Sequence, residues 1–120
     1  MKGKFIMNSE TYKAIESFNG KKCIIDNFLI CSTGTDCCFD REKTFTVKFQ
    51  IHLVYGETVK NFEFYDVTSI TLNFGSTQMV VEGFEVIDKV NDLWERDRRY
   101  YLHDYESDSI EFYCRDIALV

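Results

Sequence analysis

The sequence contains no proline, although average usage of about 5% predicts about six in a chain of this length. Its turns must therefore be built from Gly, Asn, Asp and Ser. No apolar run approaches the roughly 18 residues that a membrane-spanning helix needs, and the opening MKGKFIMNSE lacks the apolar centre of a signal peptide. We therefore expect a cytoplasmic protein that does not enter a membrane and keeps its five cysteines reduced.

Several motifs that carry chemistry are also absent. The chain has neither of the glycine-rich loops that bind phosphates, nor the G-x-S-x-G turn that presents a catalytic serine. It has no C-x-x-C pair, and the adjacent Cys37 and Cys38 point their sulfurs apart, which does not suit one zinc ion. We expect no cofactor and no metal. The alternative is a metal site formed by four residues that are far apart in the sequence and that the fold would have to bring together: Cys31, Cys37, His52 and His103. Nothing in their spacing requires it.

The charge balance is acidic. Fourteen basic and 20 acidic side chains give a net charge of −6, which argues against nucleic acid as a partner, because neutralising phosphates requires Lys and Arg. An acidic surface suits a basic protein partner, and it also suits plain solubility.

The sequence is rich in aromatic residues, and apolar and polar residues alternate along several of its segments. Eleven phenylalanines and seven tyrosines indicate a β-rich interior, and the length predicts a single domain over residues 1–120. We predict one short N-terminal helix over residues 8–20, capped by Asn8 or Ser9 and ended by Gly20. About seven mostly antiparallel strands follow, forming a β-sandwich or a curved half-barrel. Their predicted ranges are 22–31, 44–55, 59–67, 68–75, 77–88, 98–105 and 109–120.

The clearest strand covers residues 44–55, where apolar and polar side chains alternate. Period two over eleven residues predicts one face in the core and one in water. The apolar face consists of Phe45, Val47, Phe49, Ile51, Leu53 and Tyr55. Lys48 is the only charged residue in this range, so the strand offers a route to a homodimer through strand pairing if it lies at a sheet edge. The range 77–88 contains Gly83 mid-strand, which predicts a bulge or a close backbone approach.

The stretch WERDRRYYLHDYESDS, residues 94–109, gathers the only tryptophan with tyrosines, arginines and acids. Strand alternation places Tyr101 and His103 on one face and Leu102 and Asp104 on the other. Trp, Tyr and Arg are enriched at binding hot spots, so we predict a contact surface for a protein partner. It comprises Trp94, Arg98, Arg99, Tyr101, His103, Asp104, Tyr105, Glu106 and Asp108. Trp94 itself, in a polar loop, either caps the core or meets that partner.

Two other functions remain open. A small hydrolase is the first, using Asp104 and Glu106 with His103, because two carboxylates about 7 Å apart on one strand face can divide acid and base roles. The acids at the turn can instead be paired across strands by Arg98 and Arg99. The second is a carrier, in which a curved sheet rich in phenylalanine encloses a small molecule or lipid.

The second half of the chain, from Phe62 to Val120, resembles small β-rich immunity proteins of bacterial toxin–immunity systems and their uncharacterised relatives. The residues that carry the resemblance are Gly83, Phe84, Asp88, Trp94, Arg99, Tyr100, Asp104, Tyr105, Glu106, Phe112 and Cys114. The resemblance implies a binder that occludes a toxin without a cofactor. Many such toxins are basic nucleases, with which the net negative charge is compatible.

Overall fold

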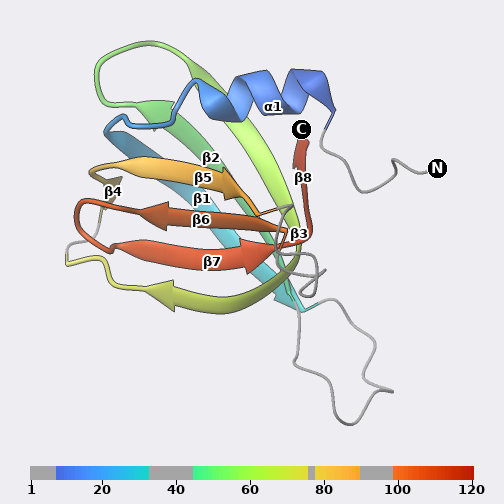
Figure 1. The fold of residues 1–120 in the computed structure, drawn as a ribbon. Helices are drawn as coiled ribbons and strands as arrows, with labels where there is room; N and C mark the ends of the chain where they lie inside the picture. Colours follow the sequence, from blue (N-terminus) through green and yellow to red (C-terminus); the bar gives the residue numbers. More distant parts are fainter. Residues whose placement is uncertain (1–7, 33–44, 76–77, 90–98) are drawn as a thin grey trace, which may run out of the picture.

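A computed structural model describes residues 8–32, 45–75, 78–89 and 99–120, and these form one helix and eight strands (Figure 1). All strand pairs are antiparallel, in the order β4-β1-β2-β3-β7-β6-β5, with β8 pairing with β3. The prediction of a mainly β fold with a short N-terminal helix is thus confirmed. The elements are α1 (Ser9–Glu16), β1 (Cys23–Ser32), β2 (Phe45–Leu53), β3 (Val59–Leu72), β4 (Met79–Val81), β5 (Phe84–Asp88), β6 (Tyr100–Asp104), β7 (Ile110–Cys114) and β8 (Asp116–Leu119).

Helix α1 begins as the sequence predicts. The Asn8 side chain accepts a hydrogen bond from the Thr11 amide at 2.8 Å, which satisfies one of the free donors of the first turn. The helix lies against β8, where the Leu119 amide donates to the Thr11 hydroxyl at 3.2 Å. Phe18 is buried just beyond the helix, and Gly20 takes a φ of +77° that favours glycine. Gly20 and Lys21, which follow α1, then form backbone hydrogen bonds with Phe84, the first residue of β5.

One long strand joins the two layers. The sequence predicts separate strands over 59–67 and 68–75, but β3 is a single strand of 14 residues. It bends where Asp66 and Ser69 take φ values of 54° and 56° and its register against β7 shifts. Its first half pairs with β2 and β8, and its second half pairs with β7 (Figure 1). The polar residues at this bend are typical of a turn, which is why the sequence pattern predicts two strands there.

The chain crosses between the layers a second time at Glu82 and Gly83. The strand predicted over 77–88 is divided there into β4, which pairs with β1, and β5, which pairs with β6. A Cβ on Gly83 would lie 2.6 Å from Cγ of Glu106 and 2.8 Å from Cζ of Tyr105. The close approach predicted at Gly83 is therefore confirmed, whereas the prediction of a single strand over 77–88 is wrong.

Aromatic rings fill the space between the layers. The rings of Phe49 and Phe64 lie 4.9 Å apart, and those of Phe64 and Phe112 lie 5.2 Å apart, centroid to centroid. Phe18 extends this cluster through edge contacts with Phe62 and Phe84. These side chains occupy the part of the interior in which a carrier would hold a ligand.

Strand β2 confirms the predicted alternation over its central part, where Val47, Phe49 and Ile51 are buried. Tyr55 departs from the prediction: the strand ends at Leu53, and Tyr55 is 87% exposed. The edge position considered for this strand is also wrong, because β2 lies between β1 and β3. Its backbone is paired on both sides, so it offers no edge for a second chain.

Candidate functional site

The outer face of β5, β6 and β7 contains the exposed part of the predicted contact surface. On β6 the side chains of Tyr100, Leu102 and Asp104 are buried, whereas Tyr101 and His103 are partly exposed. This alternation is the one that the sequence predicts. In Figure 1 the three strands lie in front of β1 and β2.

Three aromatic rings stack on one another on this outer face: those of Tyr101, His103 and Tyr113. The Tyr101 ring stacks on His103 with centroids 4.6 Å apart, and on Tyr113 with centroids 4.7 Å apart. The backbone requires this proximity, because Tyr101 and Tyr113 are direct cross-strand partners and His103 follows two residues along β6. We call these three residues, together with Glu85 and Glu111, the Tyr–His face.

The two carboxylates of the Tyr–His face hold the rings in place. Nε2 of His103 lies 2.8 Å from Oε1 of Glu85, its cross-strand partner on β5. The Tyr101 hydroxyl donates to Oε2 of Glu111 at 2.6 Å, and Glu111 is the partner of His103 on β7. Burial, and then this hydrogen bond, raise the pKa of Tyr101 above its ordinary value. Lys89 places its ammonium 5.8 Å from the centre of the Tyr101 ring, which is within the range of a cation–π contact.

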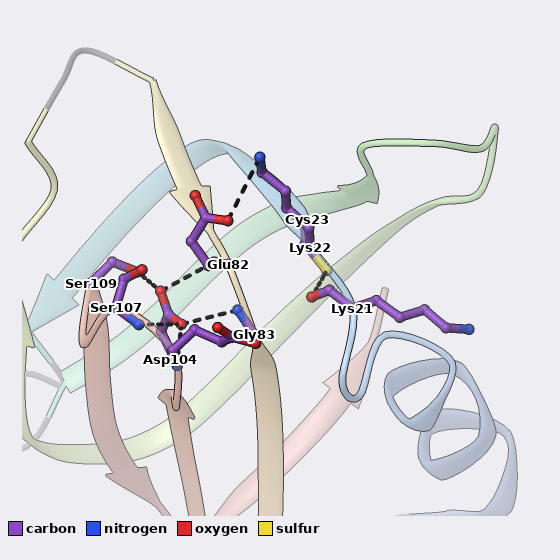
Figure 2. Close-up of polar contacts among 9 residues, drawn as sticks. Lys21, Lys22, Cys23, Glu82, Gly83, Asp104, Ser107 and Ser109 are labelled. Atoms are coloured by element: carbon purple, nitrogen blue, oxygen red, sulfur yellow. Dashed lines mark hydrogen bonds and ion pairs between the residues drawn. The ribbon is translucent and has the colours of Figure 1, made fainter.

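Asp104 does not belong to the exposed surface, and its assignment as a contact residue is a misplacement that the structure corrects. Its side chain is fully buried. Oδ1 accepts hydrogen bonds from the amides of Gly83, Glu106 and Ser107 at 3.0, 3.0 and 3.1 Å. Oδ2 accepts from the Glu82 amide at 3.2 Å and from the Ser109 hydroxyl at 2.5 Å (Figure 2). The carboxylate is therefore a structural centre with both oxygens engaged.

The charge state of Asp104 follows from these contacts. Burial by itself raises the pKa of Asp104, but the hydrogen bonds from Ser109, Gly83, Ser107 and Glu106 together lower it below its ordinary value. A carboxylate that accepts several hydrogen bonds is stabilised in its ionised form. Asp104 is thus a buried anion whose charge is dispersed over protein donors.

The carboxylate pair of the hydrolase alternative does not form on one strand face. Strand β6 ends at Asp104, and the chain turns through 105–107, so the spacing of alternate strand residues no longer applies to Glu106. Asp104 is buried beneath this turn, while Tyr105, Glu106 and Asp108 are exposed on it. We call residues 105–108 the acidic turn.

Arg99 pairs at the opposite end of β6 from the acidic turn. Its guanidinium nitrogens lie 2.9 and 3.1 Å from the two carboxylate oxygens of Asp88 on β5. The five residues of β6 lie between Arg99 and the acidic turn, whose carboxylates were its expected partners. The expected pairing of Arg99 with the acidic turn is therefore wrong. Trp94 and Arg98, the other two predicted contact residues at this end, lie outside the described residues.

The described parts of the chain hold no group of three or more His, Cys, Asp or Glu side chains arranged to bind a metal ion. Cys23 and Cys114 are buried, and Cys31 is half-buried. Burial raises the pKa of Cys23 to about 12 and also raises that of Cys114, so neither thiol is a ready nucleophile. Cys37 and Cys38 lie outside the described residues.

Three members of the Tyr–His face lie outside the contact surface that the sequence predicts: Glu85, Glu111 and Tyr113. The signal for two of them is present, because Glu111 and Tyr113 alternate with apolar residues along β7. Their contact with Tyr101 and His103 depends on strand pairing, which alternation alone does not fix. For Glu85 the signal is weaker, because β5 is short and begins directly after the break at Gly83.

Comparison with known proteins adds no relative: no protein-family model, no curated protein and no solved structure matches the chain. None of the helical structure in the described ranges is long and apolar enough to cross a membrane.

Proposed function

We propose that this chain is a non-catalytic, cytoplasmic protein-binding module, and most concretely an immunity protein that occludes a basic bacterial toxin. The observation that carries the proposal is the Tyr–His face, in which three rings and two carboxylates are held together on three paired strands.

The rings favour a protein partner over a nucleic-acid base. Tyr101 and its neighbours are fixed by stacking and hydrogen bonds, so little side-chain entropy remains to be lost on binding. Tyrosines in such preorganised positions are typical of binding hot spots. Two neighbouring rings already stack on Tyr101, which disfavours a platform on which bases stack.

The charges favour a basic partner. Glu85 and Glu111 lie within the Tyr–His face, and Glu106 and Asp108 are exposed on the acidic turn that follows β6. Within the described residues, the ammonium of Lys89 lies beside Tyr101, 5.8 Å from the centre of its ring. A concentration of one charge sign accelerates encounter with a partner of the other sign and selects against acidic competitors.

The test is affinity capture from cells that carry the gene, comparing the natural chain with a Glu85→Lys, Glu111→Lys double variant. We expect one basic protein at equal stoichiometry, with affinity reduced at least about tenfold in the double variant by like-charge repulsion. Glu57→Lys is the control for a single charge reversal elsewhere on the surface, because Glu57 is exposed between β2 and β3. Expression of the captured protein alone should stop growth, and co-expression of the natural chain should restore it.

Capture without growth arrest would contradict the immunity function. Equal binding by the natural chain and the double variant would remove the Tyr–His face as the contact surface. Circular dichroism of each variant should show the same strand signal as the natural chain, so that a loss of binding reports on the surface and not on unfolding.

A further inference from the structure

His103 occupies the centre of the Tyr–His face. From β5, Glu85 approaches its Nε2 at 2.8 Å, and from β7, Glu111 is its cross-strand partner. On its own strand the Tyr101 ring stacks on it at 4.6 Å, and on the acidic turn the Tyr105 ring lies 6.4 Å away. Its side chain is 19% exposed, so it can exchange protons with solvent while it lies among these groups.

We infer that protonation of His103 weakens binding of the basic partner, so that the Tyr–His face releases its partner as the pH falls from about 8 to about 5.5. The inference rests on the function proposed above and adds a regulation to that same site. A proton and a cationic partner compete for the same carboxylates, because each adds positive charge between Glu85 and Glu111.

Histidine is suited to this role because its ordinary charge change falls between about pH 5 and 8. Glutamate and aspartate on the surface ordinarily stay ionised throughout that interval. Of the residue types in the Tyr–His face, histidine is therefore the one whose charge ordinarily changes within that interval. An ionised carboxylate only accepts hydrogen bonds, so the Nε2 that faces Glu85 at 2.8 Å must carry a hydrogen in the neutral as well as the protonated ring. The contact with Glu85 is then kept while the charge of the ring changes.

The expected effect is moderate. One added charge about 7 Å from a partner cation, in the partly screened environment of a protein surface, corresponds to about a three- to tenfold loss of affinity. Since one proton is involved, the logarithm of the dissociation constant should change by no more than about one per pH unit.

The chain supplies its own control. It has only two histidines, and His52 also lies on a strand with a carboxylate partner, with its Nε2 3.1 Å from Asp26. His52 belongs to β2, where it pairs with β1 and β3, and it is not part of the Tyr–His face. Glutamine at either position keeps a hydrogen-bond donor toward the carboxylate but cannot gain a proton.

The experiment is an NMR titration of the natural chain, His103→Gln and His52→Gln with a triarginine peptide, at low salt and at about pH 8 and about pH 5.5. We expect shifts centred on Glu85, Tyr101 and Glu111, with three- to tenfold weaker binding at the lower pH in the natural chain and in His52→Gln. His103→Gln should bind equally at both pH values.

The outcomes separate the two proposals. Absence of peptide shifts on the Tyr–His face at either pH would overturn the proposed function, and the inference with it. Binding on that face with a pH dependence that survives in His103→Gln, or that disappears in His52→Gln, would overturn the inference alone.

Discussion

The amide of Gly83 donates to Oδ1 of Asp104 at 3.0 Å, across 21 positions of the sequence. Gly83 lies where the chain crosses from β4 to β5, and Asp104 is the last residue of β6. The same carboxylate accepts from Ser107 and Ser109 in the turn before β7. One buried anion therefore fastens the crossing between the layers to the acidic turn beside the Tyr–His face.

Replacing Asp104 with Asn should destabilise the fold by about 2–4 kcal/mol. The amide oxygen of Asn can still accept from Gly83, but its amide nitrogen cannot accept from Glu82 or from the Ser109 hydroxyl. The buried Ser109 hydroxyl and the partly buried Glu82 amide then lose their acceptor. Urea unfolding followed by circular dichroism measures the change. Asp108→Asn is the matched control, because Asp108 is exposed in the same turn, and a comparable loss there would contradict the structural role of Asp104.

Replacing Gly83 with Ala should cost about 1–3 kcal/mol. The new Cβ would lie 2.6 Å from Cγ of Glu106 and 2.8 Å from Cζ of Tyr105, so these two side chains have to shift. Gly75→Ala serves as the control, because nothing lies within 4 Å of a Cβ at Gly75. That variant should match or slightly exceed the natural stability by reducing the freedom of the unfolded chain. Equal melting temperatures for the two variants would mean that the close packing at Gly83 carries no energetic weight.

The contribution of Asp104 should disappear in acid. Its pKa is lowered in the folded state, so the unfolded chain takes up the proton more readily. The stabilisation is complete above the unfolded pKa of about 4 and is lost as the pH falls through the folded value. The difference in unfolding free energy between the natural chain and Asp104→Asn should therefore stay constant from about pH 7 to 5 and shrink below about pH 4. If this difference in unfolding free energy grew in acid instead, the pKa of Asp104 would have to be raised, not lowered, in the folded state.

Sequence patterns predicted the elements whose periodicity is local. The alternation around Val47, Phe49 and Ile51 identified a half-buried strand, and the alternation at Tyr101 and His103 assigned the two faces of β6 correctly. Both predictions need only period two and a core on one side.

The features that escaped prediction depend on distant partners. Asp104 reads as a surface acid before a turn, and it is buried because the amides of Glu82 and Gly83 reach it from another part of the chain. Strand β3 reads as two strands because Asp66 and Ser69 are residue types that tolerate turns, while their neighbours on β2, β7 and β8 hold them in one bent strand. Pairing and burial by remote segments leave no local periodicity.

Replacing Tyr101 with Phe should lower the unfolding free energy by about 0.5–1.5 kcal/mol near neutral pH. The ring and its stacking remain, but the hydroxyl that donates to Glu111 at 2.6 Å is removed. Because the folded pKa of Tyr101 is raised, this stabilisation is present below the unfolded pKa of about 10 and is lost as the pH rises through the folded value.

The measurement for Tyr101→Phe is urea unfolding at neutral pH, with Tyr55→Phe as the matched control. Tyr55 is 87% exposed, so loss of its hydroxyl should change the unfolding free energy by less than about 0.5 kcal/mol. A smaller loss at Tyr101 than at Tyr55 would mean that Glu111 does not order the ring. In that case the preorganisation from which we infer a protein partner would be absent, because the rings of the Tyr–His face would be held by stacking alone.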